Sequence, residues 1–256
     1  MKNKLTQLFQ QKNKNLLNVY CTAGFPKKES TTEVILALQE NGVDMIEIGM
    51  PYSDPIADGP VIQQSNMVAI ENGMTIQLLF EQLNSVKNSI TVPLIMMGYL
   101  NPVLQYGLEK FCENAAAVGI SGIILPDLPM YEFEEVYAPI FKRNNLSFIF
   151  LITPQTSNER IKKADKLSSG FLYAVSSSST TGTAVADEEK IDYFERINKM
   201  KLANPIMIGF GINSRESFST ACKYASGAII GSAYIKALST SDDIQTRTTE
   251  FIKKIR

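Results

Sequence analysis

Eight short apolar segments recur along this chain of 256 residues, and each is followed by a loop of turn-forming residues and then by a helix-periodic stretch. The apolar segments span residues 17–21, 45–49, 94–98, 122–125, 148–152, 171–175, 206–210 and 228–231. Strands that alternate with helices favour a parallel sheet with right-handed crossovers. Eight such units in about 250 residues predict a closed (β/α)8 barrel, the TIM-barrel architecture of the α/β class, and not an open sheet.

The stretches between and after these segments have the apolar period of helices. They span residues 31–41, 76–87, 108–118, 133–144, 157–167, 187–201, 214–224 and 242–255. A further stretch, residues 5–14, precedes the first strand, and we expect it to form an extra N-terminal helix that caps the bottom of the barrel. No linker or charge block interrupts the alternation, so the chain is predicted to form a single domain over residues 1–256.

The composition excludes several classes of function. The 25 basic and 26 acidic residues give a net charge of −1 without a basic stripe, so we expect no nucleic-acid partner. The apolar runs are far shorter than the roughly 20 residues of a membrane span, so no membrane association is expected. The absence of histidine removes Ser-His and Cys-His nucleophiles and histidine metal sites. Scattered cysteines and no apolar signal segment favour a cytoplasmic protein.

Glu47 is a charged residue in the middle of the second apolar segment. A strand of this kind is buried on both faces, and an ionised carboxylate there is costly unless it is paired, solvated by a cleft or neutralised by a raised pKa. Alternation places Met45, Glu47 and Gly49 on one face, which we expect to point into the barrel. Glu47 is therefore a candidate proton-transfer residue near the mouth, where such barrels carry their active sites. The alternative is a buried glutamate satisfied by neighbouring hydroxyl groups.

The loop after this strand contains two further carboxylates, Asp54 and Asp58. Aspartates before proline or glycine are common in turns. On this pattern alone, each of the two aspartates is expected to be a turn residue and not a catalyst, and the pattern does not separate them.

Glycine-containing loops follow the seventh and eighth strands, and they include Gly211 and the pair Gly231 and Ser232. Barrels of this architecture hold a phosphate at these two loops, through backbone N–H groups and a short helix. The alternative is that both loops are tight turns that bind no ligand. The position of the two loops, after the seventh and the eighth strand, favours a phosphate site. Three residues within the predicted strands have two possible roles, packing in the core or lining a substrate pocket. They are Tyr20, Met97 and Tyr173.

The second strand and its loop, residues 46–60, read IEIGMPYSDPIADGP and resemble the signature of the tryptophan synthase alpha chain family. The similarity continues through residues 125–129, 209–212 and 231–233, and it covers nearly the whole chain. It implies a lyase that cleaves indole-3-glycerol phosphate to indole and D-glyceraldehyde 3-phosphate by a retro-aldol reaction in tryptophan biosynthesis. It also implies a partner, the pyridoxal-phosphate-dependent tryptophan synthase beta chain, in an alpha2beta2 complex.

The resemblance also implies a role for each site residue. Glu47 matches the general acid and base, and Asp58, not Asp54, matches the acid that binds the indole N–H. The residues that match phosphate-contacting positions are Gly182, Gly211, Gly231 and Ser232. The residues that match the indole pocket are Tyr20, Met97 and Tyr173. Thr181 matches a loop residue that meets the Asp58 carboxylate when the site closes. No metal and no cofactor in this chain are implied.

One loop departs from the family. Serines at residues 176–179 stand where many members have an arginine and a glycine, so we expect a mobile loop over residues 176–183 and weak activity without the partner. Two other functions stay open. One is an allosteric activator of the beta chain with little activity of its own, and the other is a different phosphate-binding barrel enzyme, such as a sugar-phosphate isomerase or a prenyl-phosphate transferase.

Overall fold

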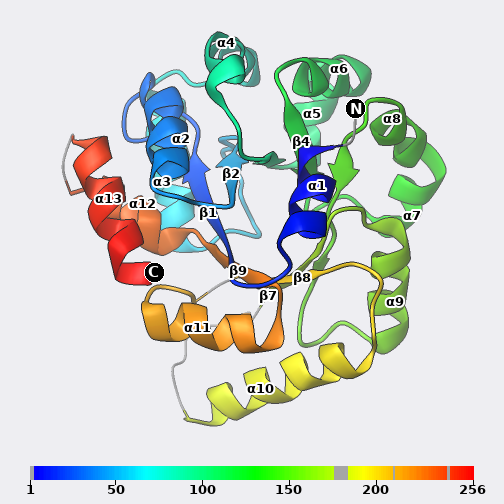
Figure 1. Cartoon of the computed structure of the whole chain (residues 1–256). Coiled ribbons are helices and arrows are strands. Elements are labelled where there is room, and N and C mark those ends of the chain that lie inside the picture. The colour runs from blue at the N-terminus through cyan, green and yellow to red at the C-terminus, as the bar shows by residue number, and fades with distance from the viewer. Residues whose placement is uncertain (1–2, 176–183, 210, 241–242) are drawn as a thin grey trace.

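The strands form one curled parallel sheet inside a ring of helices (Figure 1). The structure is a computed structural model, and it describes residues 3–175, 184–209, 211–240 and 243–256. The strands are β1 (Leu16–Thr22), β2 (Met45–Gly49), β3 (Leu94–Met97), β4 (Ile120–Ile124), β5 (Ser147–Phe148), β6 (Leu151–Ile152), β7 (Leu172–Val175), β8 (Ile206–Gly209) and β9 (Gly227–Ile230). They pair in the order β5-β4-β3-β2-β1-β9-β8-β7-β6, and all pairs are parallel.

The two end strands of this order, β5 and β6, belong to one segment of the chain, since only Ile149 and Phe150 separate them. The Ile149 N–H donates to the Ile123 carbonyl of β4 at 3.0 Å. On the other side, the Tyr173 N–H of β7 donates to the Phe150 carbonyl, also at 3.0 Å. Because this segment bonds to a strand on each side, the sheet closes on itself. The predicted (β/α)8 barrel is confirmed, with its fifth strand split into two short parts.

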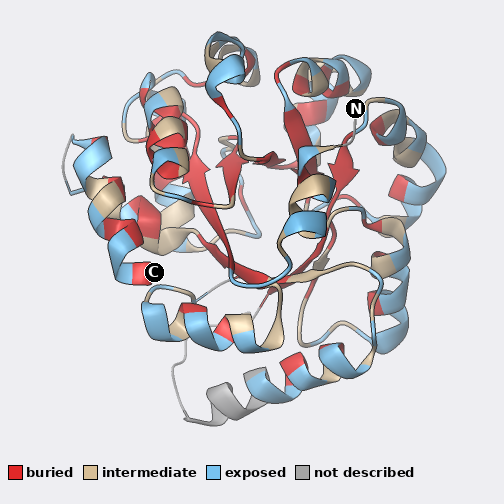
Figure 2. Ribbon diagram, viewed as in Figure 1, coloured by how far each residue is buried: buried red, intermediate tan, exposed pale blue. Residues whose placement is uncertain are grey.

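Helices cover the outside of the barrel, with buried inner faces and exposed outer faces (Figure 2). The predicted helices are confirmed as α2 (Ser30–Glu40), α4 (Ile76–Val86), α6 (Leu108–Ala117), α9 (Asn158–Leu167), α10 (Ala184–Lys199), α11 (Arg215–Tyr224) and α13 (Ile244–Ile255). A 3-10 turn, η1 (Lys87–Ser89), extends α4. The stretch predicted at residues 133–144 is composite, and it consists of α7 (Met130–Glu132), the π-helical turn η2 (Phe133–Tyr137) and α8 (Ala138–Arg143).

Three helices near the mouth are absent from the sequence-based prediction, namely α3 (Pro60–Glu71), α5 (Leu100–Tyr106) and α12 (Ser232–Leu238). Helix α3 buries Ser65 and Asn66 while it exposes Met67 and Ile70, so its apolar residues do not follow the period of a helix that packs on a core. Helices α5 and α12 have seven residues each, which is too few for a period to show.

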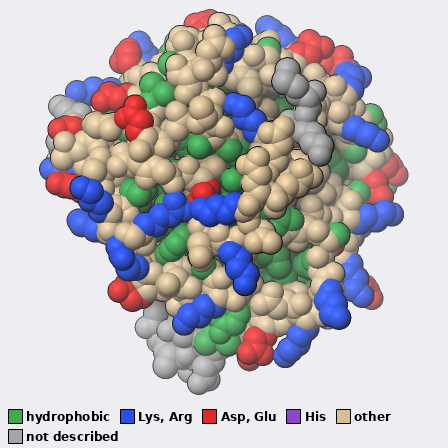
Figure 3. Space-filling view, viewed as in Figure 1, with side chains coloured by type: hydrophobic (Ala, Val, Ile, Leu, Met, Phe, Trp, Pro, Cys, Tyr) green, Lys and Arg blue, Asp and Glu red, His purple; other side chains and the backbone are tan. Residues whose placement is uncertain are grey.

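The N-terminal helix α1 (Lys4–Gln11) lies across the bottom of the barrel, as predicted (Figure 1). Asn3 accepts a hydrogen bond from the Leu5 N–H at 2.9 Å and donates one to the Ser121 carbonyl at 2.6 Å. Leu5 is fully buried, and a Cβ at Gly170 would lie 2.7 Å from its side chain. The helix therefore plugs the barrel from below. The same face carries charges of both signs (Figure 3), and none of the described helices is long and apolar enough to cross a bilayer.

Candidate active site

The opposite rim of the barrel, at the carboxyl ends of the strands, encloses a cavity of about 520 Å³. Eight of the residues that the sequence predicts for the site line this cavity, namely Tyr20, Glu47, Asp58, Met97, Tyr173, Gly211, Gly231 and Ser232. They come from four strands, three of the following loops and the first residue of α12, so the barrel brings them together from the whole length of the chain. Thr181, Gly182 and the rest of the loop over residues 176–183 lie outside the described residues.

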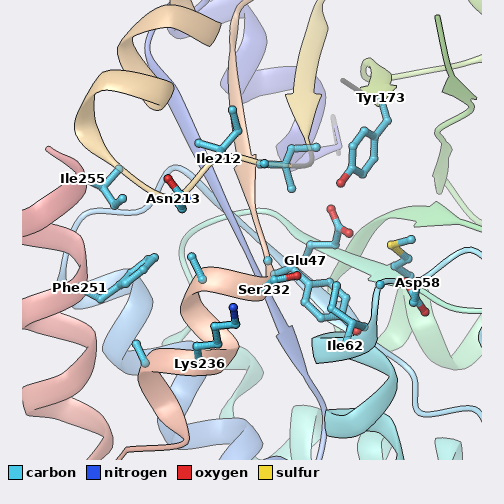
Figure 4. A pocket seen from close by; sticks show the side chains of 18 of the residues that line it. Glu47, Asp58, Ile62, Tyr173, Ile212, Asn213, Ser232, Lys236, Phe251 and Ile255 are labelled. Atoms are coloured by element: carbon cyan, nitrogen blue, oxygen red, sulfur yellow. The ribbon is translucent and has the colours of Figure 1, made fainter. Parts of the chain in front are cut away.

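Glu47 lies on β2 with only 1% of its surface exposed, and its carboxyl points toward the Tyr173 ring (Figure 4). The Asn18 amide of β1 donates a hydrogen bond to Glu47 Oε2 at 3.0 Å. Burial raises the pKa of Glu47 to about 8, because it disfavours the charged form more than the Asn18 hydrogen bond favours it, and the nearby Asp58 raises the pKa further. Glu47 therefore faces the interior as predicted, and most of it is protonated at pH 7.

Asp58 lies in the loop between β2 and α3, and its Oδ2 accepts a hydrogen bond from the Tyr99 hydroxyl at 3.1 Å. The Tyr99 oxygen in turn accepts from the Ala57 N–H at 3.0 Å, which fixes the loop next to the carboxylate. Burial raises the pKa of Asp58 to about 6, although the Tyr99 hydrogen bond lowers it. Asp54 of the same loop is exposed and does not line the cavity. The geometry thus separates the two aspartates that the turn pattern left equivalent.

Two tyrosines and a methionine give the cavity apolar walls. Tyr20 of β1 occupies the space that a Cβ at Gly49 of the adjacent strand would need, and Tyr173 of β7 does the same above Gly209 of β8. The two glycines therefore make room for the tyrosine rings inside the barrel. Met97 of β3 lies on the same cavity. Such walls suit a flat aromatic ligand whose polar end lies elsewhere.

The glycine loops form the far side of the cavity. Gly211 has a φ of +76°, so the loop after β8 needs a residue that tolerates the left-handed region. Among the residues that the structure describes, chain neighbours apart, no atom lies within 4 Å of where a Cβ at Gly211 would be. Gly231 is the N-cap of α12, and Ser232 is its first residue. The two loops therefore present backbone to the cavity from adjacent strands, β8 and β9.

Sequence reasoning missed three polar residues that line the cavity, Asn213, Lys236 and Lys254. It also missed two residues that donate hydrogen bonds to the two carboxyls, Asn18 and Tyr99. Lys236 and Lys254 line the cavity, and neither amine forms an ion pair among the residues that the structure describes. Lys236 extends from the same helix as Ser232 (Figure 4). Their spacing of four residues could have indicated this, because residues four apart lie on the same face of a helix. Asn18 and Tyr99 had no such signal, because each meets its carboxylate across separate elements.

Metal binding receives no support from the part of the chain that the structure describes. Within that part, no cluster of three or more acidic or thiol side chains has the arrangement of a metal site. The polar groups of the cavity include two carboxyls, backbone amides, two amines, the Asn213 amide and the hydroxyls of one serine and two tyrosines. This set suits proton transfer beside a bound anion.

Known proteins match the chain over almost its full length. The family model described as tryptophan synthase alpha chain matches residues 6–256. The tryptophan synthase alpha chain of Flavobacterium johnsoniae is 50% identical over 255 residues, which cover 99% of this chain and 100% of that protein. The crystal structure of the tryptophan synthase alpha chain from Legionella pneumophila has a TM-score of 0.88 at 29% identity and covers 100% of this chain and 96% of that chain. A Mycobacterium tuberculosis tryptophan synthase structure has a TM-score of 0.86 at 29% identity, with coverages of 99% and 100%. The protein belongs to the tryptophan synthase alpha chain family.

Proposed function

We propose that Glu47 and Asp58 carry out the reaction of this family, the retro-aldol cleavage of indole-3-glycerol phosphate to indole and D-glyceraldehyde 3-phosphate. The observation that carries the proposal is a pair of carboxyls in one apolar cavity with separated pKa values, about 8 for Glu47 and about 6 for Asp58. At pH 7 the first is an acid and the second is a carboxylate, which is the assignment that this reaction needs.

Each carboxyl has a distinct task. Glu47 delivers its proton to the indole ring carbon that carries the side chain. The Glu47 carboxylate then takes the proton of the glycerol hydroxyl as the carbon–carbon bond breaks, so the aldehyde forms and Glu47 returns to its acid form. The Asp58 carboxylate accepts a hydrogen bond from the indole N–H and stabilises the positive charge that develops on the ring. No redox step and no external base enter this sequence.

The remaining cavity residues bind the two ends of the substrate. The indole ring lies between Tyr20, Met97 and Tyr173, which form the apolar walls. The phosphate lies against the backbone of Gly211, Gly231 and Ser232, together with Gly182 outside the described residues. Lys236 and Lys254 support this orientation, because two amines that form no ion pair with any described carboxylate offset the charge of a phosphate at that end.

Turnover of indole-3-glycerol phosphate tests the proposal. We expect Glu47→Gln to abolish turnover and Asp58→Asn to lower kcat by roughly 10²-fold or more, because each removes a group that acts in the transition state. Asp54→Asn is the matched control, since it changes an exposed aspartate of the same loop. Full activity of Glu47→Gln, or equal losses in all three variants, would contradict the assignment of these residues. A wild-type chain that does not turn over this substrate would favour another phosphate-binding barrel enzyme.

We also propose that the mouth of the barrel binds a tryptophan synthase beta chain with its pyridoxal phosphate, in an alpha2beta2 complex in the cytoplasm. Three apolar side chains at this rim are unusually exposed, at 86% for Ile56, 47% for Leu104 and 62% for Tyr131. They follow β2, β3 and β4, which are adjacent strands, so they form one side of the rim. The buried free thiols Cys21 and Cys112 suit a reducing compartment.

A binding assay with a tryptophan synthase beta chain tests the interface. Ile56→Ser is expected to weaken binding, whereas Ile191→Ser, which changes an exposed isoleucine of α10, is the control. Assays of the isolated chain separate the lyase from the activator. Substrate cleavage by the chain alone that rises with the partner supports a lyase subunit, whereas partner stimulation without any cleavage by the chain alone supports an activator.

A further inference from the structure

The inside of the barrel contains a polar residue that neither packing nor the reaction outlined above explains. Asn18 of β1 is completely buried, and its Nδ2 donates to Glu47 Oε2 at 3.0 Å. Its other polar atom, Oδ1, is buried and has no hydrogen-bond partner among the described residues. An unsatisfied amide oxygen destabilises a core, and an apolar side chain of similar size would avoid it. The amide therefore has a use that offsets this disadvantage.

The contact makes the two Glu47 oxygens unequal. The Asn18 amide presents its N–H, and not its oxygen, to the carboxyl of Glu47. Oε2 is then an acceptor in both protonation states of Glu47, so the proton of the acid form is on Oε1. The amide bonds to Oε2 and not to Oε1. Oε1 is thus the oxygen that can give a proton to a ligand in the cavity that Glu47 lines.

The same contact also acts after proton transfer. Once Glu47 has given its proton to the substrate, a carboxylate is left in an apolar, buried position near the ionised Asp58. A donated N–H stabilises that charge more than it stabilises the neutral acid. An apolar residue at position 18 would leave the new carboxylate without this donor and would raise the barrier to proton transfer.

We propose that Asn18 is a positioning residue for the lyase reaction, which holds Oε2 of Glu47 as an acceptor so that Oε1 carries and delivers the catalytic proton. This inference rests on the proposed function of Glu47. Asn18 does not line the cavity, so it acts on the substrate only through Glu47.

The pH profile distinguishes this role from a structural one. The other titratable groups that interact electrostatically with Glu47 are Asp58 from the loop after β2, Tyr20 and Cys21 from β1, and Tyr173 from β7. Burial raises the pKa of Tyr20, Cys21 and Tyr173 above their usual ranges, so these three stay neutral around pH 8. Loss of the Asn18 donor therefore appears in the titration of Glu47, with Asp58 as its only charged neighbour among these groups.

The test compares two leucine substitutions of buried asparagines in the full chain. Asn18→Leu removes the donor at nearly constant size. Asn66→Leu is the matched control, because Asn66 of α3 is also buried, does not line the cavity, and has an Oδ1 without a hydrogen-bond partner in the described part of the chain. Rates of indole-3-glycerol phosphate cleavage are measured against pH for the wild type and both variants, and thermal unfolding reports whether each variant is folded.

We expect Asn18→Leu to lower kcat about tenfold or more with little change in KM, and to move the alkaline limb of the kcat profile up by about one pH unit. The direction follows because the hydrogen bond favours the charged form, so its loss raises the pKa of Glu47. Asn66→Leu should keep the wild-type profile. If Asn18→Leu does not fold, Asn18→Val, a smaller and β-branched change that suits a strand, repeats the test.

Two results overturn the inference in different ways. A folded Asn18 variant with the wild-type kcat and alkaline limb refutes the role of Asn18 and leaves the role of Glu47 intact. A wild-type chain that does not cleave the substrate at all refutes the proposed function, and the inference falls with it.

Discussion

Replacing Glu47 by glutamine is expected to stabilise the protein by an amount that grows with pH. The pKa of the Glu47 carboxyl is 4.5 in an unfolded chain and about 8 in the barrel. Between these values, unfolding ionises a carboxyl that the fold keeps neutral, so the unfolded state binds fewer protons than the native state. The free energy of unfolding therefore falls by about 1.4 kcal/mol for each pH unit in this window. By pH 7 the wild type has lost about 3 kcal/mol through this one group.

Glutamine has nearly the same shape as glutamate and does not ionise, so the free energy of unfolding of the variant does not fall with pH through this group. The stability of Glu47→Gln relative to the wild type should therefore rise from pH 4.5, reach a gain of about 3 kcal/mol at pH 7 and level off above pH 8. Urea unfolding followed by circular dichroism at a series of pH values measures this difference.

Asp58→Asn is the comparison variant for this experiment. The pKa of Asp58 is raised from 3.8 to about 6, so its pH-dependent gain should level off near pH 6 and not near pH 8. A stability difference between Glu47→Gln and the wild type that does not vary with pH would refute the raised pKa of Glu47, and with it the reasoning that makes this residue the acid.

Three further outcomes are expected. The kcat/KM for indole-3-glycerol phosphate should depend on pH as a bell-shaped curve. Activity should fall below about pH 6, where Asp58 becomes protonated, and above about pH 8, where Glu47 ionises. A flat profile between pH 5 and pH 9 would contradict both assignments. Gly49→Ala should lower kcat/KM by at least tenfold with an intact fold by circular dichroism, because the new methyl group displaces the Tyr20 ring from the indole wall. Lys236→Ala should raise KM several-fold with kcat nearly unchanged in steady-state assays, since it removes charge from the phosphate end and not from the reacting atoms; a fall in kcat alone would argue against that location of the phosphate.

Strand–helix alternation was sufficient to predict the barrel because the strands of a helix-covered parallel sheet are buried on both faces. Such strands read as unbroken apolar runs, which turn residues separate clearly. The prediction failed for α3, where Ser65 and Asn66 are buried and Met67 is exposed. Periodicity detects a helix only when its core face is apolar, and the core face of α3 is partly polar because Ser65 hydrogen-bonds to Thr22 of β1 at 2.7 Å.

The candidate site was predictable to the extent that its residues lie at strand ends, which share one rim whatever the details of packing. The contact of Asn18 with Glu47 could not be predicted from the sequence, because it depends on the register between β1 and β2. In that register Tyr20 pairs with Glu47. Tyr99 was missed for the same kind of reason, since its hydroxyl meets Asp58 across two separate loops. Contacts between elements require a geometry that the local sequence does not contain.

The absence of histidine gives the buried glutamate its significance. A chain of this composition has no side chain whose ordinary pKa lies near neutrality, so a group that exchanges a proton at pH 7 has to be produced by its surroundings. Burial of Glu47 inside the barrel does this, and it lowers the stability of the fold by about 3 kcal/mol at pH 7 through the raised pKa. The destabilisation and the acid strength have the same physical origin, so no substitution at position 47 can remove the first and keep the second.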